Sequence, residues 1–82
     1  MAFSHHFGFE QTFFRIDVEI SVKPERFTGR GRVYRNDEFI GEIPLVGRRN
    51  QVQIEHWTED KLRRSVSGVA EDMVKMRQWV TW

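Results

Sequence analysis

The chain has 82 residues, a formal net charge of +1 and no cysteine. This length predicts a single domain, the missing cysteines exclude a disulfide-stapled scaffold, and the near-neutral total excludes strong nucleic-acid binding from net charge alone. Hydrophobic residues make up 39% and charged residues 30% of the sequence, which favours a folded globular domain over a disordered chain.

Residues 1–12 form an aromatic and histidine-rich segment without a helical period, and its phenylalanines are Phe3, Phe7 and Phe9. One interpretation is a terminal arm that tucks these rings lightly against the body of the domain. The other is a segment that binds a partner or exchanges between subunits, because phenylalanines left in water are unusual in a monomer. The two neighbouring histidines, with only His56 to join them, are too few for the usual four-ligand metal site.

Residues 14–22 alternate strictly between apolar and polar side chains, which predicts a β-strand. A turn over residues 23–26 follows, in which proline ends the run, and a second strand is predicted over residues 27–35. An antiparallel pair in which residue 22 faces residue 27 would set two acids against two arginines on the outer face of the sheet. The expected outer pairs are Glu19 with Arg30, Asp17 with Arg32, and Arg15 with Tyr34.

Residues 29–32 read Gly-Arg-Gly-Arg and resemble the arginine–glycine patches of RNA-binding tails. Cross-strand pairing with acids explains both arginines without nucleic acid, since such pairs contribute about 0.2–1 kcal/mol each. An RNA-binding sheet surface would also need stacking aromatics, and in this sequence pattern only Tyr34 qualifies. On the inner face, Gly29, Gly31 and Gly41 would let a helix lie close to the sheet, with a bulky side chain filling the gap.

A third strand is predicted over residues 38–46, after a turn at residues 36–37 whose Asn and Asp tolerate the left-handed backbone of hairpins. A two-residue loop would place Ile40 inside but would also bury Glu42. We expect a three-residue loop, because an unpaired carboxylate in the core is costly. Pro44 lacks a ladder donor, so this strand should lie at an edge of the sheet or end there. The inner side chains would then be Phe39, Gly41, Ile43 and Leu45.

Residues 47–50 are predicted to form a loop, and the weak alternation over residues 51–57 indicates either a short fourth strand or an early start of the helix. One amphipathic helix is predicted over residues 58–80, with Thr58 as its N-cap. Gly68 in mid-helix would be tolerable if the helix approaches the sheet at that point. The predicted apolar stripe consists of Leu62, Val66, Val69, Met73, Met76 and Val80.

These elements predict an α+β fold with a single domain over residues 1–82. An antiparallel β-meander of three to four strands would occupy residues 13–57, and one long C-terminal helix over residues 58–80 would pack on one face of this sheet. Residues 1–12 would form the aromatic arm.

The sequence contains no glycine-rich phosphate loop, no HExxH pair and no GxSxG elbow. Ser65 and Ser67 lie in the predicted helix, where no histidine stands at helical spacing to activate them. His56, beside Trp57, is a lone titratable group, and such a histidine is more often a hydrogen-bonded structural residue than a catalyst. We therefore expect a protein that is not an enzyme and that holds no cofactor and no metal.

The order of strand, hairpin and long helix resembles the ββ(β)α body of the HicB-like antitoxin family. Two segments carry the resemblance, Ile-Pro-Leu-Val-Gly at residues 43–47 and Thr-Glu-Asp-Lys-Leu-Arg-Arg-Ser-Val at residues 58–66. It extends over residues 14–75 and is one of architecture, since the Leu-Pro-Gly-Cys stretch of that family is missing and the spacing before the helix is longer. The resemblance implies an antitoxin-like regulator as one candidate function.

The function we expect is that of a small interaction module that self-associates, as a homodimer, and binds another protein. Small unstapled domains often gain stability from a partner subunit, and aromatic side chains supply much of the anchoring at interfaces. The candidate contacts are the uncovered face of the sheet, its edge at Pro44 and the aromatic ends of the chain. The candidate protein-binding residues are Phe3, Phe7, Phe9, Trp57, Trp79 and Trp82.

The alternative is a module that binds RNA or DNA through the basic outer face of the sheet, using Arg30, Arg32, Tyr34, Arg48 and Arg49. No secretion-signal pattern opens the chain, and no stretch approaches the roughly 18 apolar residues of a membrane span. Together with the absence of cysteine, this predicts a cytoplasmic protein without a membrane partner.

Overall fold

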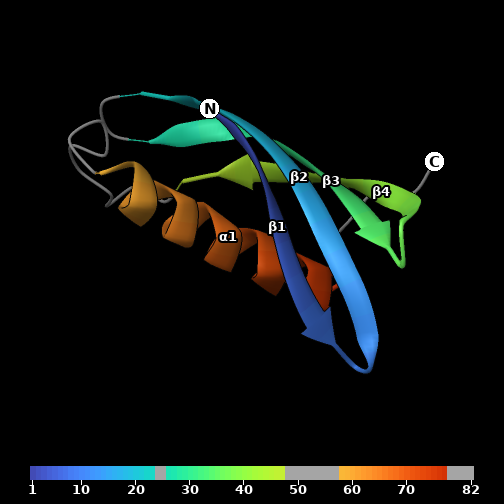
Figure 1. Cartoon of the computed structure of the whole chain (residues 1–82). Coiled ribbons are helices and arrows are strands. Elements are labelled where there is room, and N and C mark those ends of the chain that lie inside the picture. Colours follow the sequence, from blue (N-terminus) through green and yellow to red (C-terminus); the bar gives the residue numbers. More distant parts are fainter. Residues whose placement is uncertain (24–25, 48–57, 78–82) are drawn as a thin grey trace.

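The computed structural model describes residues 1–23, 26–47 and 58–77 of the chain. Its elements are β1 (Ala2–Phe9), β2 (Thr12–Val22), β3 (Phe27–Arg35), β4 (Glu38–Val46) and α1 (Glu59–Lys75). The four strands pair antiparallel in chain order, β1-β2-β3-β4, and the helix lies against one face of this sheet (Figure 1). The predicted α+β class, a meandering sheet with one helix packed on it, is confirmed.

The N-terminal segment is part of the sheet, so the prediction of a lightly docked arm over residues 1–12 is wrong. Side chains along β1 alternate between partly buried and exposed, with Phe3, Phe7 and Phe9 on the buried side. A two-residue turn joins β1 to β2 at Glu10 and Gln11, whose φ angles are 50° and 61°. Two successive left-handed residues make the turn whose twist matches a hairpin. The chain therefore enters β2 already paired with β1.

The pairing of β2 with β3 follows the predicted register. Val22 faces Phe27, and the outer pairs are Glu19 with Arg30, Asp17 with Arg32 and Arg15 with Tyr34. The strict alternation of β2 puts its apolar side chains on the buried face and its polar side chains outside. A one-residue slip would reverse these faces, which is why the hydrophobic pattern fixes the register.

The hairpin between β3 and β4 combines parts of both registers considered from the sequence. The loop has two residues, since Arg35 faces Glu38, and its Asn36 and Asp37 have φ angles of 49° and 66°. A bulge then follows, because Tyr34 faces Phe39 whereas the preceding Val33 faces Gly41. The predicted three-residue loop is therefore wrong, and the extra residue lies in the strand.

This bulge decides which side chains of β4 point to the helix. After it, Gly41, Ile43 and Leu45 are buried, as predicted, and Glu42 points outward. Phe39 precedes it and pairs with Tyr34 on the outer face, so its predicted inner position is wrong. The bulge thus keeps the Glu42 carboxylate out of the core without lengthening the loop.

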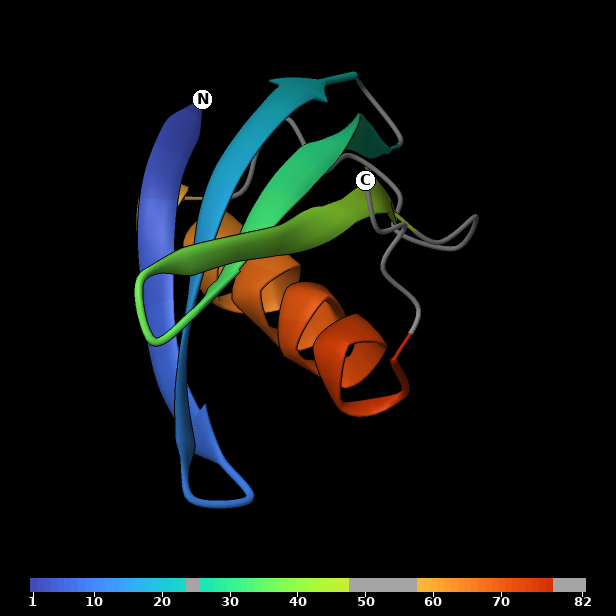
Figure 2. The same cartoon turned by 90° about the vertical axis from the view of Figure 1, so that its right-hand side faces the viewer.

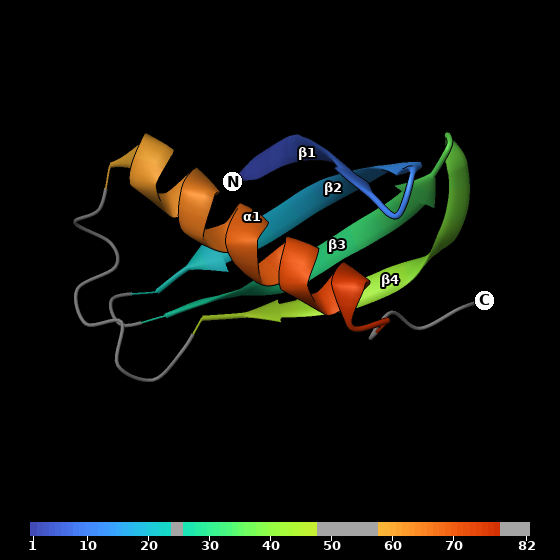
Figure 3. The ribbon, with the colours of Figure 1, turned by 90° about the horizontal axis from the view of Figure 1, so that it is seen from below.

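The inner face of the sheet and the helix form one hydrophobic core. The strands curve around the helix (Figure 2), which crosses them obliquely (Figure 3). Burying these side chains contributes about 25 cal/mol for each Å² of apolar surface removed from water. The buried hydrophobic residues are Phe14, Ile16, Val18 and Ile20 of β2, Phe27 and Val33 of β3, Ile43 and Leu45 of β4, and Leu62, Val66, Ala70 and Val74 of α1.

Helix α1 begins as predicted and ends earlier. The Thr58 hydroxyl accepts a hydrogen bond from the Lys61 amide at 3.1 Å, which confirms Thr58 as the N-cap. At the other end Met76 is the C-cap and Arg77 is left-handed, with φ of 56°, so the helix stops at Lys75 rather than at residue 80. Residues 51–57 and 78–80, on which the remaining helix and strand predictions fall, lie outside the described residues.

The apolar stripe of α1 is rotated relative to the prediction. Its buried row advances by four residues at a time, through Leu62, Val66, Ala70 and Val74, and the predicted members Val69 and Met73 only flank it. Met76, also predicted to face the sheet, is 64% exposed. A small residue at position 70 lets the helix approach the sheet, because alanine takes little room there.

The glycines differ in what surrounds them. A Cβ on Gly29 would lie 2.1 Å from the carbonyl oxygen of Glu19 on the neighbouring strand. At Gly31 the space is filled by side chains of Ile16 and Ile43, as the sequence pattern suggested. Their nearest atoms would lie 2.7 and 3.2 Å from a Cβ on Gly31. Gly68 is exposed with open space around it, so the helix does not approach the sheet at the position where the sequence would have tolerated glycine for that reason.

Candidate functional site

The helix covers only one face of the sheet, so three surfaces of the described structure are open to a partner. These are the outer face of the sheet and the free edges of β1 and β4 (Figures 1 and 3). A free edge presents unpaired backbone N–H and C=O groups, which another chain can use for strand pairing. The two edges differ in how far they are protected.

Backbone bonds of β1 identify the groups that point away from β2. Met1 and Ile20 exchange both backbone hydrogen bonds, at 2.9 Å each. In an antiparallel ladder such pairs alternate with pairs that exchange none. The pairs that exchange no hydrogen bond, the non-bonded set, are therefore Ala2–Glu19, Ser4–Asp17, His6–Arg15 and Gly8–Phe13. The free edge of β1 consequently carries the backbone groups of Ala2, Ser4, His6 and Gly8.

The side chains on this edge do little to obstruct pairing. None of the four residues whose backbone points outward has a charged carboxylate, ammonium or guanidinium group, and all four are exposed. Over its eight residues β1 contains no proline and the register shows no bulge. Natural proteins commonly protect an edge with lysine, proline or a bulge. The β1 edge has none of these protections.

The β4 edge has two of these protections, a proline and a bulge. The Gly47 amide donates to the Phe27 carbonyl at 2.8 Å, and counting the alternation from this bond places the Pro44–Arg30 pair in the non-bonded set. The nitrogen of Pro44 therefore points to the free edge, where its ring replaces an N–H donor. Ile40 forms the bulge further along the same strand. Strand addition at β4 would meet a missing donor and an irregular backbone.

Polar and aromatic contacts attach β1 to the helix. Nε2 of His5 lies 2.7 Å from Oε2 of Glu71, and Nζ of Lys75 lies 3.6 Å from the other oxygen of that carboxylate. The His5 ring stacks on Phe7 with centroids 5.7 Å apart. Protonated imidazole would make the first contact an ion pair, and neutral imidazole would make it a hydrogen bond.

Cationic side chains of the helix also lie over the first and the last phenylalanine of β1. The Arg63 guanidinium carbon is 5.3 Å from the Phe3 ring centroid, and Nζ of Lys75 is 5.7 Å from that of Phe9. Such contacts contribute about 0.5–1 kcal/mol at exposed sites. The phenylalanines predicted to bind a partner are therefore partly buried beneath helix side chains rather than free in water.

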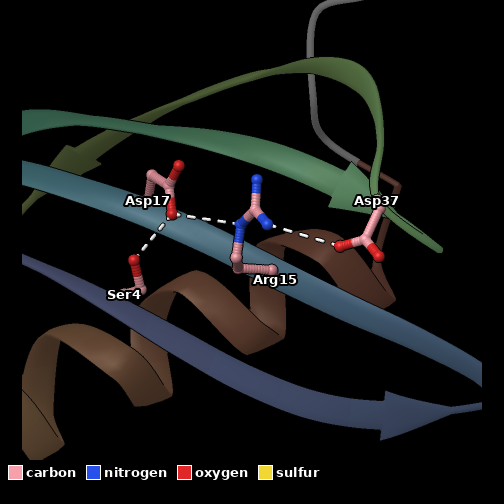
Figure 4. A network of polar contacts seen from close by, with 4 residues as sticks. All are labelled: Ser4, Arg15, Asp17 and Asp37. Carbon is pink, nitrogen blue, oxygen red and sulfur yellow. Dashed lines mark hydrogen bonds and ion pairs between the residues drawn. The ribbon is translucent and has the colours of Figure 1, made fainter.

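A polar network extends across the outer face of β1, β2 and the β3–β4 turn (Figure 4). The Ser4 hydroxyl donates to Oδ1 of Asp17 at 2.7 Å, and Nη1 of Arg15 donates to Oδ1 of Asp37 at 3.3 Å. Nε of Arg15 lies 3.3 Å from Oδ1 of Asp17, close enough for an ion pair. This buried nitrogen lacks a partner in hydrogen-bond geometry, so its contact with Asp17 is electrostatic only. The network fixes the Arg15 side chain over the sheet.

The predicted nucleic-acid residues of β3 share the outer face with both acids and aromatics. Arg30 pairs with Glu42 at 3.7 Å rather than with Glu19, which lies directly opposite it. Asp17 pairs with Arg15, and Arg32 makes no ion pair with any described residue. Arginine and acid therefore alternate over this face, which gives no continuous basic patch.

Aromatic rings line the same face near the β3–β4 turn. The Arg15 guanidinium lies 4.1 Å from the Tyr34 ring centroid, and Tyr34 meets Phe39 edge-on with centroids 5.6 Å apart. Phe13 is 77% exposed on the adjacent strand. Sequence reasoning missed Phe13 and Phe39, because Phe13 precedes the predicted strand and Phe39 was assigned to the core.

The structure separates the two sets of predicted site residues. Phe3, Phe7 and Phe9 line one side of β1 and face the helix, while the described members of the alternative set lie on the opposite face of β3. The remaining predicted residues, together with His56, lie outside the described residues; they are Trp57, Trp79, Trp82, Arg48 and Arg49.

Sequence reasoning missed the β1 edge as a site. The sequence did contain one strand signal, because Phe3, Phe7 and Phe9 stand an even number of positions apart and so lie on one side of an extended chain. Its turn residues, Glu10 and Gln11, are not the Asn-Gly or Asp-Gly pairs that usually mark a two-residue hairpin. The sequence therefore showed the spacing of a strand without the turn residues that would have indicated a hairpin.

Among residues 1–23, 26–47 and 58–77, no three histidine or acidic side chains gather in a metal-ligand group. The helix within this part of the chain is neither long enough nor apolar enough to span a membrane.

Comparisons with known proteins gave no further assignment: no family model matches the chain, and neither the curated proteins nor the solved structures contain a match.

Proposed function

We propose that this protein is a non-catalytic interaction module that binds an extended segment of another protein chain by adding it to the sheet at β1. The observation that carries the proposal is the contrast between the two edges. The β1 edge is regular and carries no lysine, arginine or acidic residue over eight residues, whereas the β4 edge has Pro44 and a bulge. Strand addition draws its affinity from main-chain hydrogen bonds and its specificity from alternate side chains.

The side chains of β1 supply the specificity that such binding requires. An added strand would lie beside partly buried rings on the helix side and beside Ala2, Ser4, His6 and Gly8 on the outer side. Aromatic rings anchor many protein interfaces, and small neighbours leave the backbone accessible. The phenylalanines predicted as contacts would therefore border the added strand on the helix side of the sheet and contact its side chains there.

The test is a proline substitution that removes an outward amide without breaking the sheet. His6→Pro takes away an N–H that points to the free edge of β1, and Val46→Pro is the matched control at the corresponding kind of position on β4, where Thr28 faces it in the non-bonded set. Both variants should retain the circular dichroism and thermal unfolding of the folded domain. Immobilised wild-type and Val46→Pro proteins should recover the same bound proteins from a lysate of the native host, and His6→Pro should lose them.

Recovery of the same proteins by His6→Pro would overturn the proposal, because main-chain pairing at β1 could then not be the contact. Loss with both proline variants would also count against it, since the effect would not be specific to the β1 edge.

A second candidate is nucleic-acid binding, or an antitoxin-like regulatory role, through the outer face. Phe13, Phe39 and the partly buried Tyr34 favour it, because aromatic rings beside arginines are the parts of a stacking surface for single strands. The interleaved acids oppose it. Gel retardation of single- and double-stranded RNA and DNA at two salt concentrations separates the candidates, since backbone binding weakens steeply as salt rises. Absence of retardation at low salt would remove this candidate.

A further inference from the structure

We infer that the segment that occupies the β1 edge is β1 of a second copy of this chain, paired antiparallel about a two-fold axis at His5. The inference rests on the proposed function and names its partner. It follows from the spacing of free backbone groups along β1 and from the side chains that the pairing would bring together.

Only one antiparallel register uses every free group. The outward backbone groups belong to Ala2, Ser4, His6 and Gly8, which form a symmetric series centred on His5. Pairing Ala2 with Gly8 of the other copy and Ser4 with His6 of the other copy satisfies all of them, with two hydrogen bonds in each pair. A shift of two residues in either direction leaves free groups at the ends of both strands. This register therefore makes the largest number of hydrogen bonds between the two strands, so it is favoured.

The side chains are compatible with this register. On the outer face it sets Ala2 against Gly8 and Ser4 against His6, so no acid, lysine or arginine faces a like charge. On the helix side Phe3 meets Phe7 of the other copy, and aromatic cross-strand pairs are stabilising. The two His5 rings meet at the axis.

Charge does not oppose the approach of the two helices. Each His5 is bound to Glu71 at 2.7 Å, and each Glu71 already has Lys75 3.6 Å away. Each carboxylate brought toward the axis therefore arrives with the Lys75 ammonium beside it. The product would be one continuous eight-stranded sheet with both helices on the same face, because a two-fold axis normal to the sheet preserves its faces.

Engineered cysteines test both the partner and the register, since the natural chain has no cysteine. In the inferred register residue 5 faces itself in a non-bonded pair, with Cα atoms about 4.5 Å apart, within disulfide range. Mild oxidation of His5→Cys should give a covalent dimer. Residue 6 and its copy would be roughly 9 Å apart, too far for a disulfide, so His6→Cys alone should stay monomeric on a non-reducing gel.

A mixture of Ser4→Cys and His6→Cys adds a positive control, because these positions face each other in the inferred register. It should yield the mixed dimer with Cα atoms about 5.5 Å apart. Adding His6→Pro to the His5→Cys variant should abolish the cross-link, and adding Val46→Pro should not.

Sedimentation of the unmodified chain completes the test. A mass near twice 9.9 kDa at micromolar concentration is expected. A mass near 9.9 kDa together with no cross-link would overturn the second copy as partner and leave the β1 edge available to another chain, which the lysate comparison reports separately. A dimer in which His6→Cys or Ser4→Cys links to itself would overturn the register.

Discussion

The centre of this domain and its β1 margin are held together by different interactions. All the buried hydrophobic residues of the described structure come from β2, β3, β4 and α1, and β1 contributes none. β1 contributes partly buried rings and an imidazole–carboxylate contact to the helix instead. The difference indicates that the buried apolar core lies in the centre, while the margin is held by backbone pairing with β2 and by partly exposed contacts with the helix.

This division suits a binding edge. Segments with few buried apolar contacts open at lower free energy than the core around them. A strand that joins β1 extends hydrogen bonding at the margin without repacking the residues beneath the helix. Substitutions at the centre should therefore lower the free energy of unfolding much more than substitutions at the margin.

The largest effect is expected at Gly29, in the centre of the sheet. A Cβ there would overlap the backbone of β2, 2.1 Å from the Glu19 carbonyl oxygen, and backbone cannot move as a side chain can. We expect Gly29→Ala to lower the free energy of unfolding by about 4 kcal/mol or more, near the upper end of single substitutions. Urea denaturation followed by circular dichroism measures it.

Gly31→Ala is the matched control, because its new Cβ would meet only side chains of Ile16 and Ile43. Overpacking of this kind costs about 1–3 kcal/mol. Equal losses at the two glycines would show that backbone overlap is not the reason for Gly29.

The next largest effect is expected at Val66, which is fully buried in the middle of the helix row. Val66→Ala should lower the free energy of unfolding by about 2–3 kcal/mol, since the removed methyl groups leave a cavity. Val69→Ala, on the partly buried flank, should cost less than half as much. If Val69 proved the costlier of the two, the predicted stripe through residues 66, 69 and 73 would be the true contact face.

The parts of the fold that could be predicted are those where one side chain pattern excluded the alternatives. Strict alternation in β2 fixed its faces and, through the turn to Phe27, the register with β3. The cost of burying Glu42 predicted the inner residues after the bulge, although the bulge itself left no signal in the composition. The predicted helix stripe omitted Ala70, because the sequence alone does not distinguish a buried alanine from one on the surface of a helix.

The candidate site could be predicted only in part. Phe3, Phe7 and Phe9 stood out by composition, but their strand was missed because its turn lacks glycine and asparagine. Ion pairs on the outer face depended on which of several reachable partners each long side chain selects. Arg15 pairs with Asp37 across the turn, although the register sets it opposite Tyr34. Arg30 pairs with Glu42 on the next strand, although Glu19 lies directly opposite it.

A smaller effect, of opposite sign, is expected on the solvent side of the helix. A Cβ at Gly68 meets no atom within 4 Å, so Gly68→Ala gains helix propensity without a clash. It should raise the free energy of unfolding by about 1 kcal/mol, measured by urea denaturation. A loss of stability would mean that the helix face is covered in solution, for instance by a neighbouring chain, and the same variant studied at several protein concentrations would reveal that.

The smallest effect is expected at the margin itself. Glu71→Gln removes the charged partner of His5, and both side chains are about one quarter exposed, at 25% and 28%. Exposed or half-exposed pairs of this kind contribute under about 1 kcal/mol, so global unfolding should hardly change. Amide hydrogen exchange is the sensitive measurement, read at a protein concentration low enough to keep the chain monomeric. The β1 amides that bond to β2, His5 and Phe7 among them, should exchange up to about fivefold faster while those of β3 stay unchanged. Asp72→Asn, one residue along the helix on its exposed side, is the control and should alter neither. If the β3 amides accelerated together with those of β1, the two regions would open as one cooperative unit, and β1 could not be the separately attached margin that its contacts indicate.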